Sequence, residues 1–232
     1  MKNPIKYILG ALFSKNPPLS AKTAPPPPEE ETPQKIYTIF AGVNGAGKTS
    51  LYEVLKNVSD LGERVNIDEI VQGMGTWRDT LIQIRAGREA MRKINALIER
   101  GVSFHQETTL PGPTIIKQVK TAKSGGFYIR LYYVGIDNID TAIDRVHRRV
   151  ERGGHGIEDD VIKRRFEKLS VNLKELLPLC DRIVFYDNSV RFRQIAIMSG
   201  GFIVDCDRDC PPWFYELELK YGLAGAEDFA AF

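Results

Sequence analysis

Cysteine is scarce in this chain of 232 residues, which holds only Cys180, Cys206 and Cys210. An odd and small number of cysteines provides no disulfide framework and is typical of a reducing compartment. Cys206 and Cys210 lack the further cysteine or histidine partners that a zinc site needs. The acidic run around them imitates a calcium loop, but Cys210 stands where such a loop requires glycine. The sequence therefore predicts neither a disulfide scaffold nor a metal-binding module.

Long hydrophobic runs and an excess of charge of one sign are also missing. No apolar run approaches the ~20 residues that a membrane helix needs. The formal net charge is +2, so no overall field favours nucleic acid or a membrane surface as a partner. The apolar stretch 5–13 could be read as a weak signal peptide, but it is short and prolines follow it. We expect a cytoplasmic protein with no nucleic-acid partner and no clear membrane span.

Proline is concentrated in one segment, residues 16–34. That segment includes Pro25–Pro28 and the acidic run Glu29–Glu31, and it cannot bury enough apolar surface to fold. Such a composition favours extended polyproline geometry and indicates a linker. We therefore expect residues 1–34 to form a flexible or disordered tail with a proline-rich linker, and residues 35–232 to form one domain.

From residue 35 onward, short apolar segments rich in β-branched residues alternate with segments of helical periodicity. The expected strands are 36–41, 63–67, 102–106, 127–134 and 182–186. The expected helices are 47–55, 79–100, 113–123, 138–152 and 158–176. Strict alternation predicts an α/β protein with a parallel sheet covered by helices on both faces. Beyond residue 192, we expect two short strands around Ser199-Gly200-Gly201 and a mixed C-terminal segment.

The segment from Gly42 to Thr49 matches the phosphate-binding pattern G-x-x-x-x-G-K-[ST] at every fixed position. Glycines let main-chain N–H groups surround phosphate oxygens, and the following helix adds its positive N-terminal end. Lys48 is expected to reach the β- and γ-phosphates, and the Thr49 hydroxyl to bind Mg²⁺. A strand before the motif and a helix after it predict a P-loop NTPase fold with ATP and Mg²⁺ as cofactors. The expected nucleotide ligands are Gly42, Asn44, Gly45, Ala46, Gly47, Lys48, Thr49 and Ser50.

Two carboxylates follow predicted strands, and ligands of such sheets bind at the rim formed by the carboxyl ends of the strands. Asp68 follows the second strand and is expected to take a proton from an acceptor hydroxyl; it could also cap a helix. Glu107 ends the third strand and could hold the acceptor or a Mg²⁺-bound water, the alternative being a carboxylate exposed to solvent. Thr109 could donate a hydrogen bond to the same acceptor.

Arginine recurs at positions 145, 148, 149 and 152, so these side chains share one face of a helix. The glycine-rich segment Gly153-Gly154-His155-Gly156 follows that helix. An arginine face beside a glycine-rich hinge suits a lid that closes over a triphosphate, although a solvated basic face is the simpler alternative. With a phosphate loop in the same domain we favour the lid, and we expect Arg149 to bind the nucleotide.

Together these features resemble the zeta toxin family over about residues 36–189. The resemblance rests on the phosphate loop, Asp68, Arg88 on the long helix, Glu107-Thr108-Thr109 and the arginine helix. It implies an ATP- and Mg²⁺-dependent kinase that phosphorylates a sugar hydroxyl; in the family the substrate is UDP-N-acetylglucosamine. It also implies an antidote (antitoxin) protein as partner. It also implies that Lys48 binds phosphate, Asp68 is the catalytic base, Glu107 and Thr109 bind the acceptor, and Arg145 stabilises the moving phosphoryl group.

The sequence departs from that family at two acceptor positions. Pro111 stands where the family carries an arginine, and Met91 stands where an acidic sugar ligand is expected; Glu89 is near but out of register. The acceptor therefore stays open between a nucleotide sugar and another small molecule with a hydroxyl group. Two other functions also stay open: a nucleotide-dependent ATPase or switch that acts on a protein partner, and a nucleotide-binding protein without catalysis.

Overall fold

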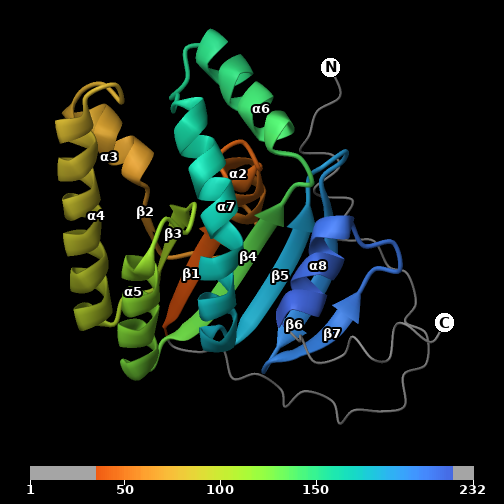
Figure 1. Ribbon diagram of the computed structural model, residues 1–232. Coiled ribbons are helices and arrows are strands. Elements are labelled where there is room, and N and C mark those ends of the chain that lie inside the picture. The colour runs from red at the N-terminus through yellow and green to blue at the C-terminus, as the bar shows by residue number, and fades with distance from the viewer. Residues whose placement is uncertain (1–34, 222–232) are drawn as a thin grey trace.

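The computed structural model describes residues 35–221 (Figure 1). Its strands are β1 (Ile36–Ala41), β2 (Glu63–Val65), β3 (Phe104–Thr108), β4 (Tyr128–Gly135), β5 (Arg182–Asp187), β6 (Arg193–Ser199) and β7 (Phe202–Cys206). Its helices are α2 (Lys48–Leu55), α3 (Ile67–Met74), α4 (Thr80–Arg100), α5 (Pro113–Ser124), α6 (Ile139–Glu151), α7 (Asp159–Leu176), the short 3₁₀ helix η1 (Leu177–Leu179) and α8 (Pro212–Tyr221). The expected tail and linker at 1–34, and residues 222–232 of the expected domain, lie outside the described residues. Within the described part, no helix is both long and apolar enough to cross a membrane.

The strands form one seven-stranded sheet in the order β2-β3-β1-β4-β5-β6-β7. The first five strands in this order run parallel, whereas β6 and β7 are antiparallel to their neighbours. The α/β sheet predicted from the alternating pattern is confirmed, but it is mostly rather than wholly parallel. The two antiparallel pairings were not predicted. They follow from the short connections 188–192 and Gly200-Gly201, because a parallel pairing needs a crossover of about a dozen residues or more.

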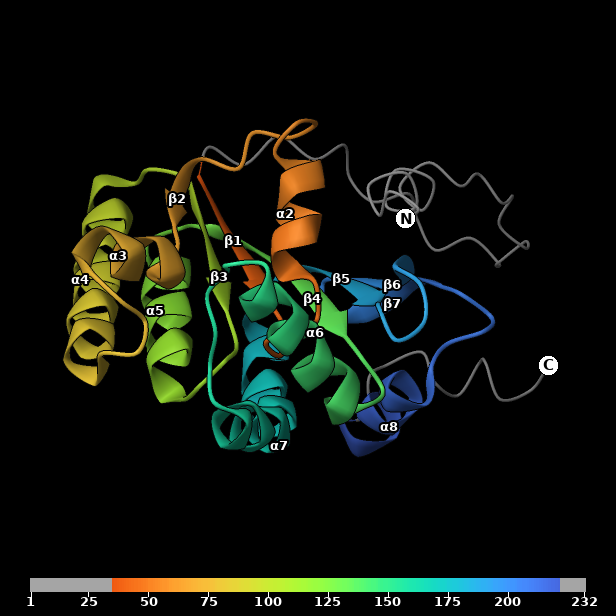
Figure 2. The ribbon, with the colours of Figure 1, turned by 90° about the horizontal axis from the view of Figure 1, so that it is seen from above.

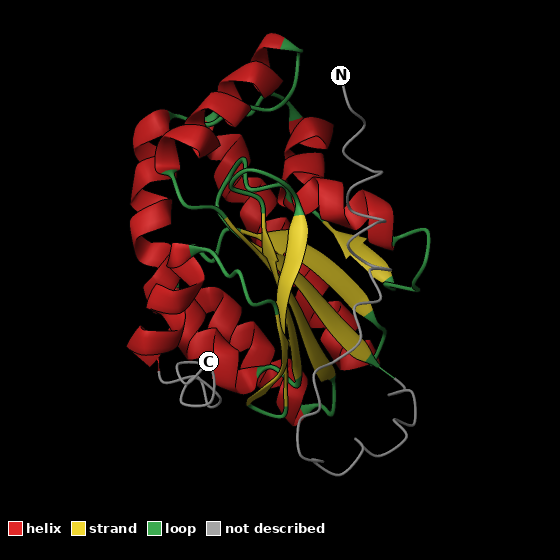
Figure 3. Cartoon of the chain, turned by 90° about the vertical axis from the view of Figure 1, so that its right-hand side faces the viewer, coloured by secondary structure: helices red, strands yellow, loops and turns green. Residues whose placement is uncertain are grey.

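Helices lie on both faces of this sheet, as the sequence predicted. Seen from above, α2 lies on one side of the strands, and α5, α7 and α8 lie on the other (Figure 2). α3 and α4 pack against each other beside β2, at the edge of the sheet. The strands twist relative to one another, as chains of L-residues do (Figure 3). The carboxyl ends of the parallel strands point towards α6, so the loops that follow these strands gather at one rim.

The central strand β1 is packed on both faces of the sheet. Phe40 stacks on Tyr132 of β4 with ring centroids 5.3 Å apart, and Tyr37 stacks on Phe104 of β3 at 4.2 Å. Side chains alternate along a strand, so these two stacks lie on opposite faces. Buried aromatic pairs of this kind stabilise the position of β1. They therefore also fix the start of the loop that follows it.

A side-chain cap sets the start of α3, a helix that the sequence did not predict. Asn66 Oδ1 accepts a hydrogen bond from the backbone N–H of Asp68 at 2.9 Å, which makes Asn66 the N-cap. β2 therefore ends at Val65, shorter than expected. The capping role considered for Asp68 is wrong, because Asp68 lies in the first turn of α3. Its carboxylate is left available for other contacts.

Candidate active site

The phosphate-loop motif forms the connection from β1 to α2. The angle φ is +81° at Gly45 and +109° at Gly47, a region that favours glycine. A Cβ atom at Gly45 would lie 2.5 Å from the carbonyl oxygen of Ala142, so the loop packs directly against the backbone of α6. α2 begins at Lys48 and presents its first N–H groups to the loop. This arrangement is an anion-binding cradle with a helix N-terminus at its base.

Lys48 is partly buried within this loop. Its Nζ donates hydrogen bonds to the carbonyl oxygens of Gly42 at 2.9 Å and Val43 at 3.0 Å. Burial lowers the pKa of Lys48 to about 8, and the charges of Glu107 and Asp68 oppose that shift. Both carboxylates are therefore close enough to act on the ammonium group. Lys48 is protonated in most molecules at neutral pH.

Glu107, at the end of β3, receives hydrogen bonds from three other segments. Its Oε2 accepts from the Thr49 hydroxyl at 2.7 Å. Its Oε1 accepts from Arg64 Nη2 at 2.8 Å and from Asn66 Nδ2 at 3.1 Å. The Glu107 side chain is only 9% exposed. The alternative of a carboxylate exposed to solvent is therefore wrong, and Glu107 lies directly beside the phosphate loop.

The oxygen atoms of Thr49 and Glu107 fit the chemistry of Mg²⁺. This ion prefers hard oxygen ligands and usually takes only one or two from the protein, the rest coming from phosphates and water. Among residues 35–221, no group of three or more histidine, cysteine, aspartate or glutamate side chains forms a complete metal cage. A hydroxyl and a carboxylate next to an anion cradle thus suit an ion that arrives with a nucleotide.

Arg64 was not singled out in the sequence, yet it organises this side of the site. Its guanidinium group lies 3.6 Å from the centroid of the Tyr52 ring in a cation–π contact. It also pairs with Glu69 at 2.7 Å, besides its bond to Glu107. The Tyr52 ring in turn stacks on His105 with centroids 5.0 Å apart. Arg64 is thereby fixed in the orientation in which it binds Glu107.

Asp68 lies on the same rim, and its side chain is half exposed. Its Oδ1 atom is 3.5 Å from His155 Nε2, in the glycine-rich segment after α6. Burial lowers the pKa of His155, while the charge of Asp68 opposes that shift. The His155 ring also contacts Trp77 with centroids 5.6 Å apart, and Gly156 packs closely on the same Trp77 ring. Two connections, 75–79 and 152–158, therefore meet beside Asp68.

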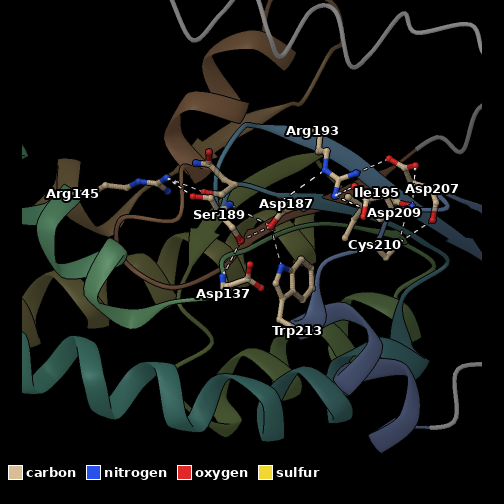
Figure 4. Close-up of polar contacts among 11 residues, drawn as sticks. Asp137, Arg145, Asp187, Ser189, Arg193, Ile195, Asp207, Asp209, Cys210 and Trp213 are labelled. Carbon is tan, nitrogen blue, oxygen red and sulfur yellow. Dashed lines mark hydrogen bonds and ion pairs between the residues drawn. The ribbon is translucent and has the colours of Figure 1, made fainter.

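The arginine helix α6 faces the phosphate loop. Arg145 Nη2 donates to the carbonyl oxygen of Asn188 at 2.8 Å, and its Nη1 is 3.5 Å from the carbonyl oxygen of Gly45. Figure 4 shows Arg145 extending towards the loop that contains Ser189. Side chains of this helix line a cavity of about 430 Å³. The lining residues are Arg145, Arg148, Arg149, Arg152 and Gly154. The shared arginine face expected from the spacing is thus present.

The guanidinium group of Arg149, on this face, is incompletely hydrogen-bonded. Its Nε and Nη2 atoms are buried and have no hydrogen-bond partner among the described residues. Its charge lowers the pKa of Lys48 and of His155, so the three groups are neighbours. Buried guanidinium groups without partners are costly and are usually satisfied by an anion. Arg149 therefore provides free donors beside the phosphate loop.

Two further side chains bind the phosphate loop from distant segments. Arg165 on α7 donates from Nη1 to Asn44 Oδ1 at 3.0 Å. Asn188, after β5, donates from Nδ2 to the carbonyl oxygen of Ala46 at 2.7 Å. The strand order β1-β4-β5 brings the end of β5 near the loop that follows β1. The loop is thus held by α6, α7 and the segment after β5.

Two expected site residues, Thr109 and Ser50, and two positions where the sequence departs from the family, Met91 and Glu89, make few contacts. Thr109 is partly exposed, and its side chain makes no hydrogen bond to the described residues. Ser50 and Met91 are exposed on α2 and α4. Glu89 pairs with Arg92 at 2.8 Å rather than with a residue of the rim. The expected roles of Thr109 towards an acceptor and of Ser50 towards the nucleotide rest on the sequence alone, and Met91 and Glu89 had no expected role.

No known family model matches this chain. The chain is 34% identical over 133 residues to an uncharacterized protein of Haemophilus influenzae, and the match covers 57% of this chain and 94% of that protein.

Solved structures share the fold at low sequence identity. A chain of the AvrRxo1-ORF1:AvrRxo1-ORF2 complex with sulphate ions has a TM-score of 0.61 and 16% identity, over 79% of this chain and 63% of that chain. This chain thus spans less than two thirds of that one. The same complex with ATP has a TM-score of 0.56 and 16% identity, over 85% and 74%. A structure of the PezAT chromosomal toxin-antitoxin system of Streptococcus pneumoniae has a TM-score of 0.52 and 16% identity, over 88% and 90%. These similarities show that the chain shares the α/β fold of these structures.

Proposed function

We propose that this chain, which belongs to the same family as the Haemophilus influenzae protein, is an ATP-dependent kinase of the zeta toxin type that phosphorylates a hydroxyl group of a small molecule. One observation carries the proposal. Glu107 accepts from the Thr49 hydroxyl of the phosphate loop at 2.7 Å and from Asn66 at 3.1 Å, and Asn66 caps the helix whose first turn carries Asp68, so a phosphate cradle and two carboxylates share one rim. The kinase domain is taken as residues 35–232, with residues 1–34 as tail and linker.

The residues around the loop would hold ATP in distinct ways. The loop amides and Lys48 bind the phosphates, together with Gly42, Asn44 and the other loop residues predicted from the motif. Thr49 and Glu107 would hold Mg²⁺, which when bound neutralises charge on the β- and γ-phosphates. The complex of AvrRxo1-ORF1 and AvrRxo1-ORF2 with ATP supports ATP as the nucleotide. The free donors of Arg149 add positive charge at the same place.

Asp68 and Arg145 supply the chemistry of transfer in this proposal. The half-exposed Asp68 carboxylate accepts the proton of the acceptor hydroxyl while the oxygen of that hydroxyl forms a bond to the γ-phosphorus. The bond from the γ-phosphorus to the bridging oxygen breaks, and ADP leaves with that oxygen. Arg145, bound to the backbone of the loop, stabilises negative charge that develops on the transferring group.

The acceptor is proposed as a sugar hydroxyl, with UDP-N-acetylglucosamine as the first candidate from the resemblance. Glu107 had two expected roles, to hold the acceptor or to hold a Mg²⁺-bound water. Its hydrogen bonds all go to Thr49, Arg64 and Asn66, which favours the role at the metal ion. Thr109 stays a proposed acceptor ligand. A second protein that restrains the kinase is also proposed, because the similar solved structures come from a two-protein complex and a toxin-antitoxin system.

The experiment is an acceptor screen with labelled ATP over nucleotide sugars, free sugars and nucleosides. Wild type should transfer label to at least one acceptor, and Asp68→Asn should lower that rate by about 10²–10⁴-fold. Asp160→Asn, which changes an exposed aspartate in the first turn of α7, is the matched control and should retain the rate. Equal transfer by Asp68→Asn and wild type on every acceptor would remove Asp68 from the base role.

The alternative, an ATPase or switch that acts on a protein partner, predicts a different result. Its usual sign is a strand of four apolar residues that ends in Asp-Glu. β3 instead reads Phe104-His105-Gln106-Glu107-Thr108. Steady hydrolysis of ATP without any acceptor, raised by a protein partner, would favour that alternative over the kinase.

A further inference from the structure

Two of the three cysteines lie together, away from the phosphate loop. Cys206 ends β7 and Cys210 precedes α8, and their sulfur atoms are 3.4 Å apart. Cys206 is partly exposed, whereas Cys210 is buried. Both are free thiols. Within residues 35–221 they have no third metal-binding side chain beside them, so a metal site does not explain the pair.

The two thiols are chemically unequal. The contact between the two thiols lowers the pKa of Cys206, and the same contact, with burial, raises the pKa of Cys210. The partly exposed Cys206 is therefore the better nucleophile of the two. The third cysteine, Cys180, is buried at the end of η1, and burial raises its pKa as well. Reactivity is thus concentrated at Cys206.

The segment between the two cysteines is bound to the rest of the sheet by Arg193. Arg193 Nη1 donates to Asp207 Oδ2 at 2.7 Å, and its Nη2 donates to the carbonyl oxygen of Asp209. The Cys210 thiol also donates to the carbonyl oxygen of Asp207 at 3.1 Å. Arg193 Nε lies 3.9 Å from Asp187 Oδ2 at the end of β5. Figure 4 shows this row of polar contacts from Asp207 and Asp209 through Arg193 to Asp187.

The row continues from Asp187 to the nucleotide loop. Asp187 Oδ1 accepts from Ser189 Oγ at 2.7 Å and from Trp213 Nε1 of α8 at 3.0 Å. The residue between Asp187 and Ser189 is Asn188, which donates to Ala46 of the phosphate loop and accepts from Arg145. A shift of the 207–209 segment or of α8 therefore changes the contacts of the Asp187 side chain. Asp187 in turn positions Asn188 and Ser189, and Asn188 contacts the phosphate loop.

We propose that Cys206 and Cys210 are a peroxide-sensitive dithiol, and that its oxidation to a disulfide disturbs the contacts of Asp187 and Asn188 and weakens nucleotide binding. The sulfur atoms are 3.4 Å apart and must approach to about 2.05 Å, which draws together the ends of the 207–209 segment. The coupling to nucleotide rests on the proposed function, whereas the disulfide itself does not.

Hydrogen peroxide is the oxidant in this step. The Cys206 sulfur bonds to one peroxide oxygen, the O–O bond breaks, and the other oxygen leaves as water with the Cys206 proton. The Cys210 sulfur then bonds to the Cys206 sulfur, the S–O bond breaks, and a second water leaves with the Cys210 proton. Two thiols and one peroxide thus give one disulfide and two waters; the sulfurs lose two electrons and peroxide gains them.

The test treats the full-length chain with hydrogen peroxide and measures both the bond and ATP affinity. Mass spectrometry should find a Cys206–Cys210 peptide lighter by two hydrogen atoms, with Cys180 still free. The dissociation constant for ATP should rise by about fivefold or more, and dithiothreitol should restore it. Cys206→Ser should abolish both changes, whereas Cys180→Ser should retain both.

Arg193→Gln separates the bond from its effect, since it should still form the disulfide but lose most of the change in ATP affinity. Absence of the disulfide in wild type, or a disulfide with unchanged ATP affinity, would overturn the proposal. If the reduced wild type bound no ATP, the proposed function and the coupling would both fail, while mass spectrometry would still decide the disulfide.

Discussion

The Thr49 hydroxyl donates a hydrogen bond to Glu107 Oε2 over 2.7 Å and joins two residues 58 positions apart in the chain. A hydroxyl has one proton, so this bond leaves the lone pairs of the Thr49 oxygen for other partners. Arg64 and Asn66 hold Glu107 in turn. The oxygen atoms that would bind a cation are therefore oriented before a nucleotide arrives.

Changing Glu107 to glutamine should weaken the effect of Mg²⁺ on ATP binding. Glutamine has the same size but lacks the charge that attracts the ion and pairs with Arg64. We expect the tightening of ATP binding by Mg²⁺ to fall by about tenfold or more, with affinity in EDTA unchanged or improved. Calorimetric titrations with and without Mg²⁺ measure this. Glu69→Gln removes the exposed partner of the same arginine and is the control; equal losses with and without Mg²⁺ in Glu107→Gln would contradict the metal role.

ATP affinity should fall as pH rises through the pKa of Lys48. In the free protein this pKa is about 8, and bound phosphates would raise it, so binding takes up a proton above that pH. Affinity should therefore be constant below about pH 7 and fall by up to about tenfold per pH unit above about pH 8. Lys48→Arg keeps its charge in this range and should show no such fall. A wild-type affinity independent of pH up to 10 would show that Lys48 does not contact the phosphates.

Removing the charge of Arg149 should separate binding from stability. Its Nε and Nη2 atoms are buried without partners, and its positive charge repels that of Lys48 and lowers the pKa of Lys48. Arg149→Met should lower ATP affinity by about tenfold, since one charged hydrogen bond contributes about 1.5 kcal/mol or more. The melting temperature of the nucleotide-free protein should stay equal or rise. Arg148→Met is the matched control, because Arg148 is exposed and pairs with Asp144, and it should alter neither quantity much. A large loss of stability in Arg149→Met would argue for a structural role instead.

Gly45→Ala should destabilise the fold around the loop. The new Cβ would lie 2.5 Å from the Ala142 carbonyl oxygen at a φ of +81°, so the loop or α6 must move. We expect a loss of about 2 kcal/mol in the free energy of unfolding, measured by urea denaturation. Gly73→Ala, in α3 with open space around it, should instead add about 0.5 kcal/mol. Similar effects of the two changes would mean that the close packing of Gly45 is relaxed in solution.

Much of the fold could be predicted because short, local sequence patterns determine most of its helices and strands. The range of β1 matches its apolar run, and α4 ends at the expected Arg100. α3 was missed because its signal is one capping side chain, Asn66, next to a strand of three residues. The two strands around Gly200-Gly201 were expected, but their antiparallel pairing was not, because the alternation of strands and helices does not set strand direction, which the short connections decide.

The candidate site divides in the same way. The phosphate loop is a contiguous motif, so it could be found directly, and the spacing of the arginines predicted the face that lines the cavity. The partners of Glu107 could not be found, because Arg64 and Asn66 reach it only when β2 lies next to β3. The contact of Asn188 with the phosphate loop depends on the order of β1, β4 and β5 in the sheet. The catalytic roles of Asp68 and Arg145 stay predictions.

Trp77 and His155 belong to connections far apart in the chain, and their rings meet beside Asp68. The Asp68 carboxylate is half exposed, so the two rings border it rather than cover it. A smaller residue at position 77 would remove the ring contact that helps to hold His155 beside the carboxylate, and the carboxylate itself would stay accessible.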